Sequence, residues 1–309
     1  MTTTLSKPKF VLRGHTNWVY DVTFSPDSSR LATAGWDHTI RLWDPMSGQL
    51  NTTLRGHSTE VYCLAFSPSG ETLASGSANN DSGVRLWDVS SGTPVGTLLG
   101  HNNVVHDIAF SPDEKLIASV SYDKTVRLWD WQNQRERVVL QGHRRQVEAV
   151  AFTSDGTALC SASADTIARR WDVQTGKLIH EYPAVLPWAH ALAFSSTLSM
   201  FAVGYGHRPP GSRRPQGMAR IWHLRDNRLV QTMKGHRNWI YSVAFSADAQ
   251  RLATGGWDGT VKLWDLRRGV ELMTLKNHID VVRTVAFSPD GRWLASAGYD
   301  QRVCLWEIG

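Results

Sequence analysis

Tryptophan recurs along this chain at a nearly constant interval, and this period constrains the fold more than any other feature of the sequence. The recurring residues are Trp43, Trp87, Trp129, Trp171, Trp222, Trp264 and Trp306. They are separated by 44, 42, 42, 51, 42 and 42 residues, so seven copies of one unit fill almost the whole sequence. A unit of this size cannot bury its apolar face alone, which indicates stacked units that share a core. We therefore expect one domain over residues 1–309.

The composition is typical of a soluble globular protein, with 41% hydrophobic and 20% charged residues. The formal net charge of +5 favours acidic partners and permits weak contact with nucleic acid. Of the three cysteines, Cys63 and Cys160 lie in apolar runs, and none has metal-ligand or redox spacing, which indicates core residues in a reducing compartment. No segment has the character of a signal peptide or a membrane span, so we expect a cytoplasmic protein without membrane contact.

Each regular unit begins with a Gly-His pair, or Asn-His in the last unit, and a Phe follows nine residues after the His. Residues between them alternate between apolar and polar, as in 19–24, which predicts a strand with one buried face. A Ser-Pro-Asp-Gly type of turn, a short second strand, an Asp-containing turn and a third strand that reaches the Trp come next. A polar fourth strand ends the unit. Four antiparallel strands per unit and no helical pattern predict an all-β protein.

With these motifs the chain resembles the WD40-repeat family over residues 9–309, and the close mutual similarity of its repeats resembles bacterial members. The resemblance implies a closed β-propeller of seven blades. Residues 9–12 precede the first Gly-His pair, where a fourth strand belongs, and the chain ends just after the third strand of the last unit. We therefore expect the N-terminal strand to complete blade 7 and close the ring, which removes the unpaired edges at its seam.

Six units repeat a His, a Ser or Thr, an Asp and a Trp at fixed positions. A Ser-His-Asp set is typical of hydrolases, but a catalytic triad needs one copy beside an oxyanion hole, not six. In the WD40 family the set implies a structural tetrad, in which Asp accepts from the imidazole and the hydroxyl accepts from the indole. Loss of one member is expected to cost roughly 1–3 kcal/mol. The predicted tetrads are His15, Thr33, Asp37 and Trp43; His57, Ser75, Asp81 and Trp87; His101, Ser119, Asp123 and Trp129; His143, Ser161, Asp165 and Trp171; His236, Thr254, Asp258 and Trp264; and His278, Ser296, Asp300 and Trp306.

The fifth unit departs from this pattern. Val185, Val203 and Gln216 stand where the His, the hydroxyl and the Asp belong, so Trp222 must find another acceptor. A Pro-, Gly- and Arg-rich stretch at 206–217 predicts a mobile, solvated loop. Two interpretations of this loop are open: a tolerated insertion or a basic contact element.

In WD40 proteins, three positions per blade point toward the face on which the turns leading into the innermost strands converge. Two lie three and five residues after the His, and the third immediately precedes the Asp. Aromatic residues gather at these positions, and Trp, Tyr and Arg carry most of the energy of protein interfaces. The predicted partner-binding residues are Trp18, Tyr20, Trp36, Tyr62, Trp188, His190, Trp239, Tyr241, Trp257, Arg283 and Tyr299.

Within this set, Arg283 is placed to pair with a carboxylate of the partner or to stack on an indole. The competing interpretation is that the rings pack against one another and seal the mouth of the central channel. We expect a noncatalytic scaffold or adaptor without metal or cofactor, monomeric or part of a hetero-complex, that binds a protein or peptide. No Gly-rich phosphate loop and no CxxC or HExxH motif occurs.

Two alternatives remain. The same aromatic face could bind a nucleic acid or a small molecule through base stacking. A channel-centred, metal-dependent enzyme could instead use His106, Glu148 and His190, which occupy equivalent positions on three successive blades.

Overall fold

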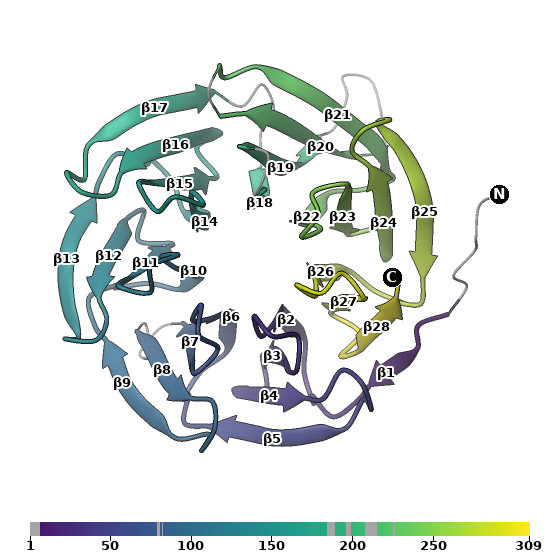
Figure 1. Ribbon diagram of the computed structural model, residues 1–309, viewed down its shortest axis with the longest axis horizontal. Coiled ribbons are helices and arrows are strands. Elements are labelled where there is room, and N and C mark those ends of the chain that lie inside the picture. Colours follow the sequence, from purple (N-terminus) through teal and green to yellow (C-terminus); the bar gives the residue numbers. More distant parts are fainter. Residues whose placement is uncertain are drawn as a thin grey trace.

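The computed structural model describes residues 7–78, 81, 83–183, 189–195, 199–207, 215–224 and 226–309, with the backbone alone for residues 183, 189, 190 and 207. Within these ranges, all regular elements are strands, and they form seven four-stranded antiparallel sheets. The sheets stand radially around a central axis (Figure 1). The predictions of an all-β fold and of a seven-bladed propeller are confirmed.

Strands are numbered along the chain, and each blade is given from its innermost to its outermost strand. Blade 1 consists of β2 (Val19–Phe24), β3 (Leu31–Gly35), β4 (Thr39–Trp43) and β5 (Leu50–Arg55). Blade 2 consists of β6 (Val61–Phe66), β7 (Thr72–Ser77), β8 (Val84–Asp88) and β9 (Pro94–Leu98). Blade 3 consists of β10 (Val105–Phe110), β11 (Leu116–Ser121), β12 (Val126–Asp130) and β13 (Arg135–Leu140). Blade 4 consists of β14 (Val147–Phe152), β15 (Ala158–Ser163), β16 (Ile167–Asp172) and β17 (Leu178–Pro183).

The remaining three blades follow the same order. Blade 5 consists of β18 (Ala189–Phe194), β19 (Met200–His207), β20 (Gln216–His223) and β21 (Leu229–His236). Blade 6 consists of β22 (Ile240–Phe245), β23 (Arg251–Gly256), β24 (Thr260–Asp265) and β25 (Val270–Lys276). Blade 7 consists of β26 (Val282–Phe287), β27 (Trp293–Gly298), β28 (Val303–Glu307) and, from the other end of the chain, β1 (Phe10–Leu12).

The two ends of the chain meet in blade 7. Strand β1 pairs antiparallel with β28, in the register Phe10↔Leu305 and Leu12↔Val303, so the sheet order is β1-β28-β27-β26. This confirms the prediction that the N-terminal strand completes blade 7. Because this sheet combines β1 with β26, β27 and β28, the ring cannot open without breaking it.

The core lies between neighbouring blades. The second strand of a blade is buried on both faces, as in β3 and β27, whereas the outermost strand β5 begins with three exposed residues. Val19 and Leu31 of blade 1 share a cluster with Trp293 and Val303 of blade 7, and equivalent clusters recur around the ring. Each blade therefore buries its apolar face only by packing on the next one.

The innermost strand of every blade has a β-bulge at the same place. In blade 1 the register shifts between Val19 and Asp21, and the same shift occurs in the other six blades. A bulge re-aims the side chain of its extra residue. The register skips one residue in each blade, and this residue occupies one of the three predicted face positions. The skipped residues are Tyr20, Tyr62, His106, Glu148, His190, Tyr241 and Arg283.

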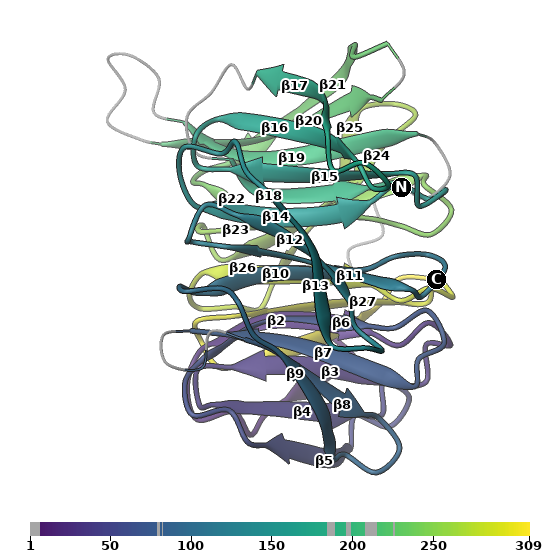
Figure 2. The ribbon, with the colours of Figure 1, turned by 90° about the vertical axis from the view of Figure 1, so that its left-hand side faces the viewer.

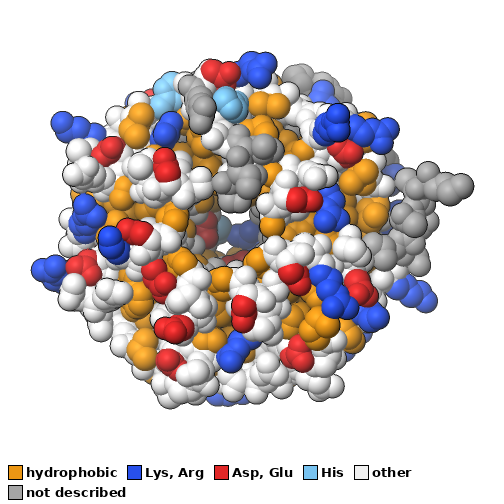
Figure 3. Space-filling model, viewed as in Figure 1, with side chains coloured by type: hydrophobic (Ala, Val, Ile, Leu, Met, Phe, Trp, Pro, Cys, Tyr) orange, Lys and Arg blue, Asp and Glu red, His pale blue; other side chains and the backbone are white. Residues whose placement is uncertain are grey.

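The strands run across the thickness of the disc, so their connections divide between two faces (Figure 2). We call upper the face with the Gly-His connections and the turns between second and third strands of each blade. The lower face has the Ser-Pro-Asp turns and the C-terminal Gly309, which lies against Arg292. Viewed from the lower face, the ring has an open centre with charged side chains inside (Figure 3).

Candidate functional site

Among the described residues, six blades contain the same hydrogen-bonded set of four side chains. In blade 1, His15 Nδ1 lies 2.9 Å from Asp37 Oδ2 and His15 Nε2 lies 2.8 Å from Thr33 Oγ1, while Trp43 Nε1 donates to this hydroxyl at 2.9 Å. The distance from indole to hydroxyl is 2.8 to 3.0 Å in all six sets. All six hydroxyl-bearing residues have 0% exposure, so their oxygens are out of reach of a substrate.

The Asp of each set also accepts hydrogen bonds from the connections on the upper face. Asp37 accepts hydrogen bonds from the backbone N–H of Thr16 at 3.0 Å and from the hydroxyl of Thr39 at 2.6 Å. Burial alone would raise the pKa of Asp37, but the bonds from His15 and Thr39 hold this pKa well below its usual value. The carboxylate therefore ties the loop that enters a blade to the turn between its second and third strands.

The tetrad of blade 7 differs in charge from that of blade 2. Burial lowers the pKa of His57, and the nearby cation of Arg85 lowers it further despite the bond to the tetrad Asp. In blade 7, Cys304 occupies the position of this cation. Burial again opposes the charge of His278, but hydrogen bonds to Asp300 and Cys304 outweigh it and raise the pKa to about 9. The surroundings of His278 therefore favour the charged imidazolium, whereas those of His57 disfavour it.

Blade 5 replaces the tetrad with a different acceptor. Trp222 donates a hydrogen bond to the hydroxyl of Tyr205. Tyr205 is only 2% exposed, and this burial raises its pKa to about 12. Val203, at the expected hydroxyl position, packs with Phe201 and Met218 in an apolar cluster. The Asp position, Gln216, pairs in strand register with His207.

The loop predicted at 206–217 is shorter than expected at both ends. Strand β19 continues to His207 and β20 begins at Gln216, because Gly206 and Gly217 pair across the hairpin. Val185 and residues 208–214 lie outside the described residues.

The bulge residues and their neighbours enclose a cavity of about 180 Å³ on the ring axis. Arg283 spans it from blade 7: its Nη2 lies 2.9 Å from Nε2 of His106 in blade 3, and its Nη1 donates to the Tyr241 carbonyl at 3.4 Å. The guanidinium carbon also lies 4.9 Å from the ring centre of Tyr20 and 5.5 Å from that of Tyr241. Arg283 thus connects the aromatic residues of blades 1 and 6 across blade 7.

Five rings from three blades form one packed group, which we call the blade 1 cluster. Trp18 stacks on Tyr299 of blade 7 at 4.2 Å and 11°, and Tyr20 stacks on Trp36 at 5.3 Å and 7°. Tyr62 of blade 2 meets Tyr20 edge-on at 4.8 Å. All five side chains are half-buried. Here the rings do pack against one another, as the competing interpretation of the sequence expects.

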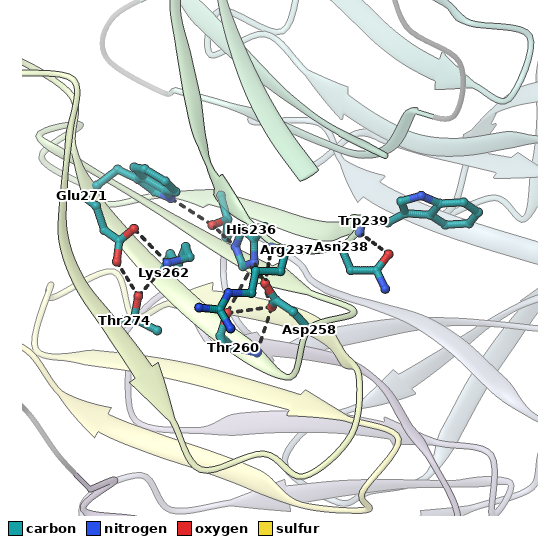
Figure 4. Close-up of polar contacts among 11 residues, drawn as sticks. His236, Arg237, Asn238, Trp239, Asp258, Thr260, Lys262, Glu271 and Thr274 are labelled. Carbon is teal, nitrogen blue, oxygen red and sulfur yellow. Dashed lines mark hydrogen bonds and ion pairs between the residues drawn. The ribbon is translucent and has the colours of Figure 1, made fainter. Parts of the chain in front are cut away.

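Trp239, Tyr241 and Trp257 form a second group, the blade 6 cluster. Trp239 and Trp257 are perpendicular at 5.5 Å, and Tyr241 lies 5.8 Å from Trp257. Trp257 is 46% exposed, whereas Trp239 lies so close to Gly206 of blade 5 that a Cβ there would be 2.3 Å from its ring. Figure 4 shows Trp239 on the far side of Asn238 from the tetrad of blade 6, its backbone N–H held by the Asn238 side chain at 2.9 Å.

The structure thus gathers nine of the predicted face residues around the channel mouth, in two clusters joined by Arg283. Trp188 lies outside the described residues, as does the side chain of His190. Tyr122 of blade 3 occupies a face position but is absent from the predicted partner-binding residues; it stacks on His106 at 5.1 Å and extends the aromatic residues into blade 3. Its position, immediately before the tetrad Asp, was the available signal.

The residues of the alternative metal site are only partly described. His106 Nδ1 donates to the backbone carbonyl of Glu148 at 2.7 Å, which occupies one of the nitrogens a metal would use. The described part of the chain contains no group of three or more His, Cys, Asp or Glu side chains that could hold a metal ion. It also contains no helix long and apolar enough to cross a membrane.

Comparison with known proteins gives matches to one family model throughout the regular blades. The model described as WD domain, G-beta repeat matches residues 6–44, 48–88, 92–130, 134–172, 227–265 and 269–307. Blade 5 is the blade without a match of its own, in agreement with its altered polar residues.

Curated relatives are similar over single repeats. A segment of 44 residues is 48% identical to Ribosome assembly protein 4 of Chaetomium thermophilum, covering 14% of this chain and 8% of the relative. A segment of 41 residues is 46% identical to Cross-pathway control WD-repeat protein 2 of Flammulina velutipes and covers 13% of this chain. A segment of 42 residues is 45% identical to Small ribosomal subunit protein RACK1 of Candida albicans and covers 14% of this chain. Each of these two covers 13% of the relative, so the chain spans only a small part of the curated proteins it matches.

Proposed function

Because this chain belongs to the WD40-repeat family, we propose that it is a noncatalytic adaptor that binds a protein or peptide on its upper face. The observation that carries the proposal is the accessible blade 6 cluster beside Arg283 at the channel mouth. Trp257, which is 46% exposed on the turn between β23 and β24, is an aromatic anchor that a partner can cover.

The tetrads support a structural role for the residues that most resemble catalytic ones. Each buried hydroxyl already accepts an indole N–H and contacts an imidazole nitrogen, so it has neither access to a substrate nor a free oxyanion site beside it. The tetrads fix the positions of the upper connections, on which the aromatic residues stand.

The names of the matched relatives describe a ribosome assembly protein and a ribosomal subunit protein. By analogy we place this chain in the cytoplasm as a monomer or as one member of a hetero-complex. Its three cysteines are free and buried, which suits a reducing compartment.

The proposal is tested by affinity capture from native lysate with wild-type protein and two matched variants. Trp257→Ala removes the exposed anchor, and Val95→Ala removes an apolar side chain of similar exposure, 52%, on the outermost strand β9. We expect Trp257→Ala to lose the captured partner and Val95→Ala to retain it, with both melting temperatures close to that of the wild type. Equal capture by all three proteins would refute binding through the upper face.

A further inference from the structure

The two faces of the disc differ in charge. Connections on the upper face expose basic side chains in almost every blade. Of the acidic side chains outside the tetrads on this face, Asp280 is exposed and Glu60 is half-buried. The exposed basic residues in or beside the described upper connections are Arg13, Arg55, Lys124, Arg144, Arg145, Arg237 and Lys276.

The lower face carries both signs, with acidic side chains gathered around its opening (Figure 3). Its turns use Asp to bind their own backbone N–H groups, as Asp27 does with Ser29 at 3.0 Å. The exposed acidic residues of this face are Asp27, Glu71, Asp113, Asp155, Asp226, Asp248 and Asp290. This face also exposes basic residues, such as Lys115, Lys177 and Arg268, so an approaching anionic segment meets both signs here and mainly basic side chains on the upper face.

Arg283 places a cation at the channel mouth, where the charge of Glu148 favours its protonated form. Among the described residues its hydrogen-bond acceptors are His106 Nε2 and the Tyr241 carbonyl, and no acidic side chain forms an ion pair with it. His106 donates from Nδ1 to the Glu148 carbonyl, so its Nε2 is the unprotonated acceptor and the imidazole is neutral. The direct contacts of the guanidinium are therefore with neutral groups and ring faces, and a bound anion could pair with it directly.

Three acidic residues, Asp21, Asp107 and Glu148, line the cavity, and the first two accept backbone N–H groups of neighbouring blades. Asp21 accepts the backbone N–H of Leu64 in the next blade at 2.8 Å, and Asp107 accepts that of Val150 at 2.8 Å. Both carboxyl groups thereby link neighbouring blades. Burial raises the pKa of Asp21 to about 6 and that of Asp107 to about 7, so at neutral pH Asp21 is largely ionised and Asp107 is partly protonated.

We propose that the upper face binds an acidic peptide segment, with one carboxylate entering the channel mouth to pair with Arg283. This inference rests on the proposed function and adds the chemistry of the ligand. The cavity of about 180 Å³ is smaller than the pockets of about 300–1,000 Å³ that hold drug-sized ligands, so it suits one carboxylate-bearing side chain or chain end and not a nucleotide. The carboxylate comes either from an Asp or Glu side chain or from a free C-terminus.

The apolar contacts of the segment lie beside this charge. Ile279, 77% exposed, is on the connection entering blade 7, and Trp257 is on the turn of blade 6 that packs against it through Gly259 and Asp280. A peptide that places a carboxylate at Arg283 can therefore cover Trp257 and Ile279 with an apolar neighbour, and the surrounding basic connections attract its remaining acids.

The test is selection from a random-peptide library on wild-type protein, Arg283→Gln, Trp257→Ala and, as a basic control on the lower face, Lys115→Gln. We expect wild type and Lys115→Gln to enrich the same acidic peptides, and Arg283→Gln to bind the best of them at least about thirtyfold more weakly, in line with the loss of a desolvated charge pair. An unchanged affinity of Arg283→Gln would overturn the inference.

Synthetic forms of the selected peptide test the inference on unaltered protein, so a variant that fails to fold does not obscure the result. A C-terminal amide that binds weakly identifies the chain end as the carboxylate, and a Glu→Gln or Asp→Asn peptide that binds weakly identifies the side chain. If neither change weakens binding, the inference is wrong while the proposed function stands. If wild type selects no peptide but binds a short single-stranded oligothymidylate, both are wrong.

Discussion

Blades 1 and 6 carry the same three residues at the face positions, a Trp, a Tyr and a Trp, yet the structure uses them differently. In blade 1 the rings are half-buried in a packed group with Tyr299 and Tyr62. In blade 6, Trp257 remains 46% exposed and Tyr241 faces the guanidinium of Arg283. The same three residues are therefore covered by packing in blade 1, whereas in blade 6 one of them, Trp257, remains accessible to a partner.

The difference arises from the neighbouring blades. Trp18 rests on the ring of Tyr299 from blade 7, whereas Trp239 rests on the backbone of Gly206 from blade 5. On the other side, blade 1 is followed by Tyr62 and blade 6 by Arg283, which contacts Tyr241 and leaves Trp257 uncovered. The exposure of a ring in a propeller depends on the blade beside it as much as on its own position.

The largest expected effect is on the folding stability of blade 1. Trp36→Ala removes a ring held between Trp18, Tyr20 and Tyr62, and we expect it to lower the free energy of unfolding by about 3 kcal/mol. Trp257→Ala should lower it by less than about 1 kcal/mol, because this ring is largely exposed. Denaturant unfolding of both variants measures the contrast. Equal losses of unfolding free energy would show that the blade 1 rings are no more important for stability than Trp257.

A second contrast concerns pH. Asp21 of blade 1 and Ser242 of blade 6 occupy the same position, and each accepts a backbone N–H of the next blade. Burial raises the folded-state pKa of Asp21 from 3.8 to about 6, although bonds from Leu64 and Thr284 and the charge of Arg283 oppose this. The stability that the protonated form provides is complete below about pH 4 and is lost as the pH rises through about 6.

Asp21→Ser gives blade 1 the residue that blade 6 has at this position. The variant should lose less unfolding free energy than the wild type between about pH 4 and pH 6, by on the order of 2–3 kcal/mol. Asp107, with a pKa raised to about 7, maintains a further decline in both proteins. Denaturant unfolding across this range measures the slopes. A variant that declines as steeply as the wild type would show that Asp21 is not the titrating group.

The third effect is on binding and falls on blade 6. Trp257→Ala should weaken the selected acidic peptide by about thirtyfold, or about 2 kcal/mol, because it removes an exposed aromatic anchor. Trp18→Ala should change the affinity less, since that ring is occupied by its stack on Tyr299. Calorimetric titration of both variants measures the difference. A larger loss for Trp18→Ala would reverse the assignment of the two blades.

The smallest effect tests the support beneath Trp239. Gly206→Ala places a methyl group against the indole ring, so the ring must shift, and we expect losses of about 1 kcal/mol in stability and about fivefold in peptide affinity. Gly96→Ala is the control, because its new methyl group meets only the flexible end of Gln134. Equal behaviour of the two variants would show that Trp239 does not depend on the blade 5 backbone.

Much of the fold could be predicted from the sequence because its signals are local and repeated. The Trp period, the alternation in segments such as 19–24 and the missing fourth strand of the last unit led to seven blades closed by β1. The acceptor for Trp222 could not be predicted, because Tyr205 stands two residues beyond the expected hydroxyl position. Register within β19, not local pattern, brings it to the indole.

The site was less predictable for a related reason. Counting from the His identified which side chains face the channel mouth, but whether a ring is covered depends on residues of other blades, such as Gly206 beneath Trp239. The contact between Arg283 and His106 joins residues 177 positions apart on blades 7 and 3. Pairs of this kind depend on closure of the whole ring and have no signature within one repeat.

Site-specific photocrosslinking tests the role of the upper face most directly. A benzophenone amino acid is placed at position 257 on blade 6, at position 36 on blade 1 or at position 95 on the outermost strand β9, and the protein is irradiated in native lysate. We expect adducts predominantly from position 257, with the attached partner peptides rich in Asp and Glu or ending in a free carboxylate. Adducts of equal yield from position 95, or attached peptides without acidic groups, would contradict it.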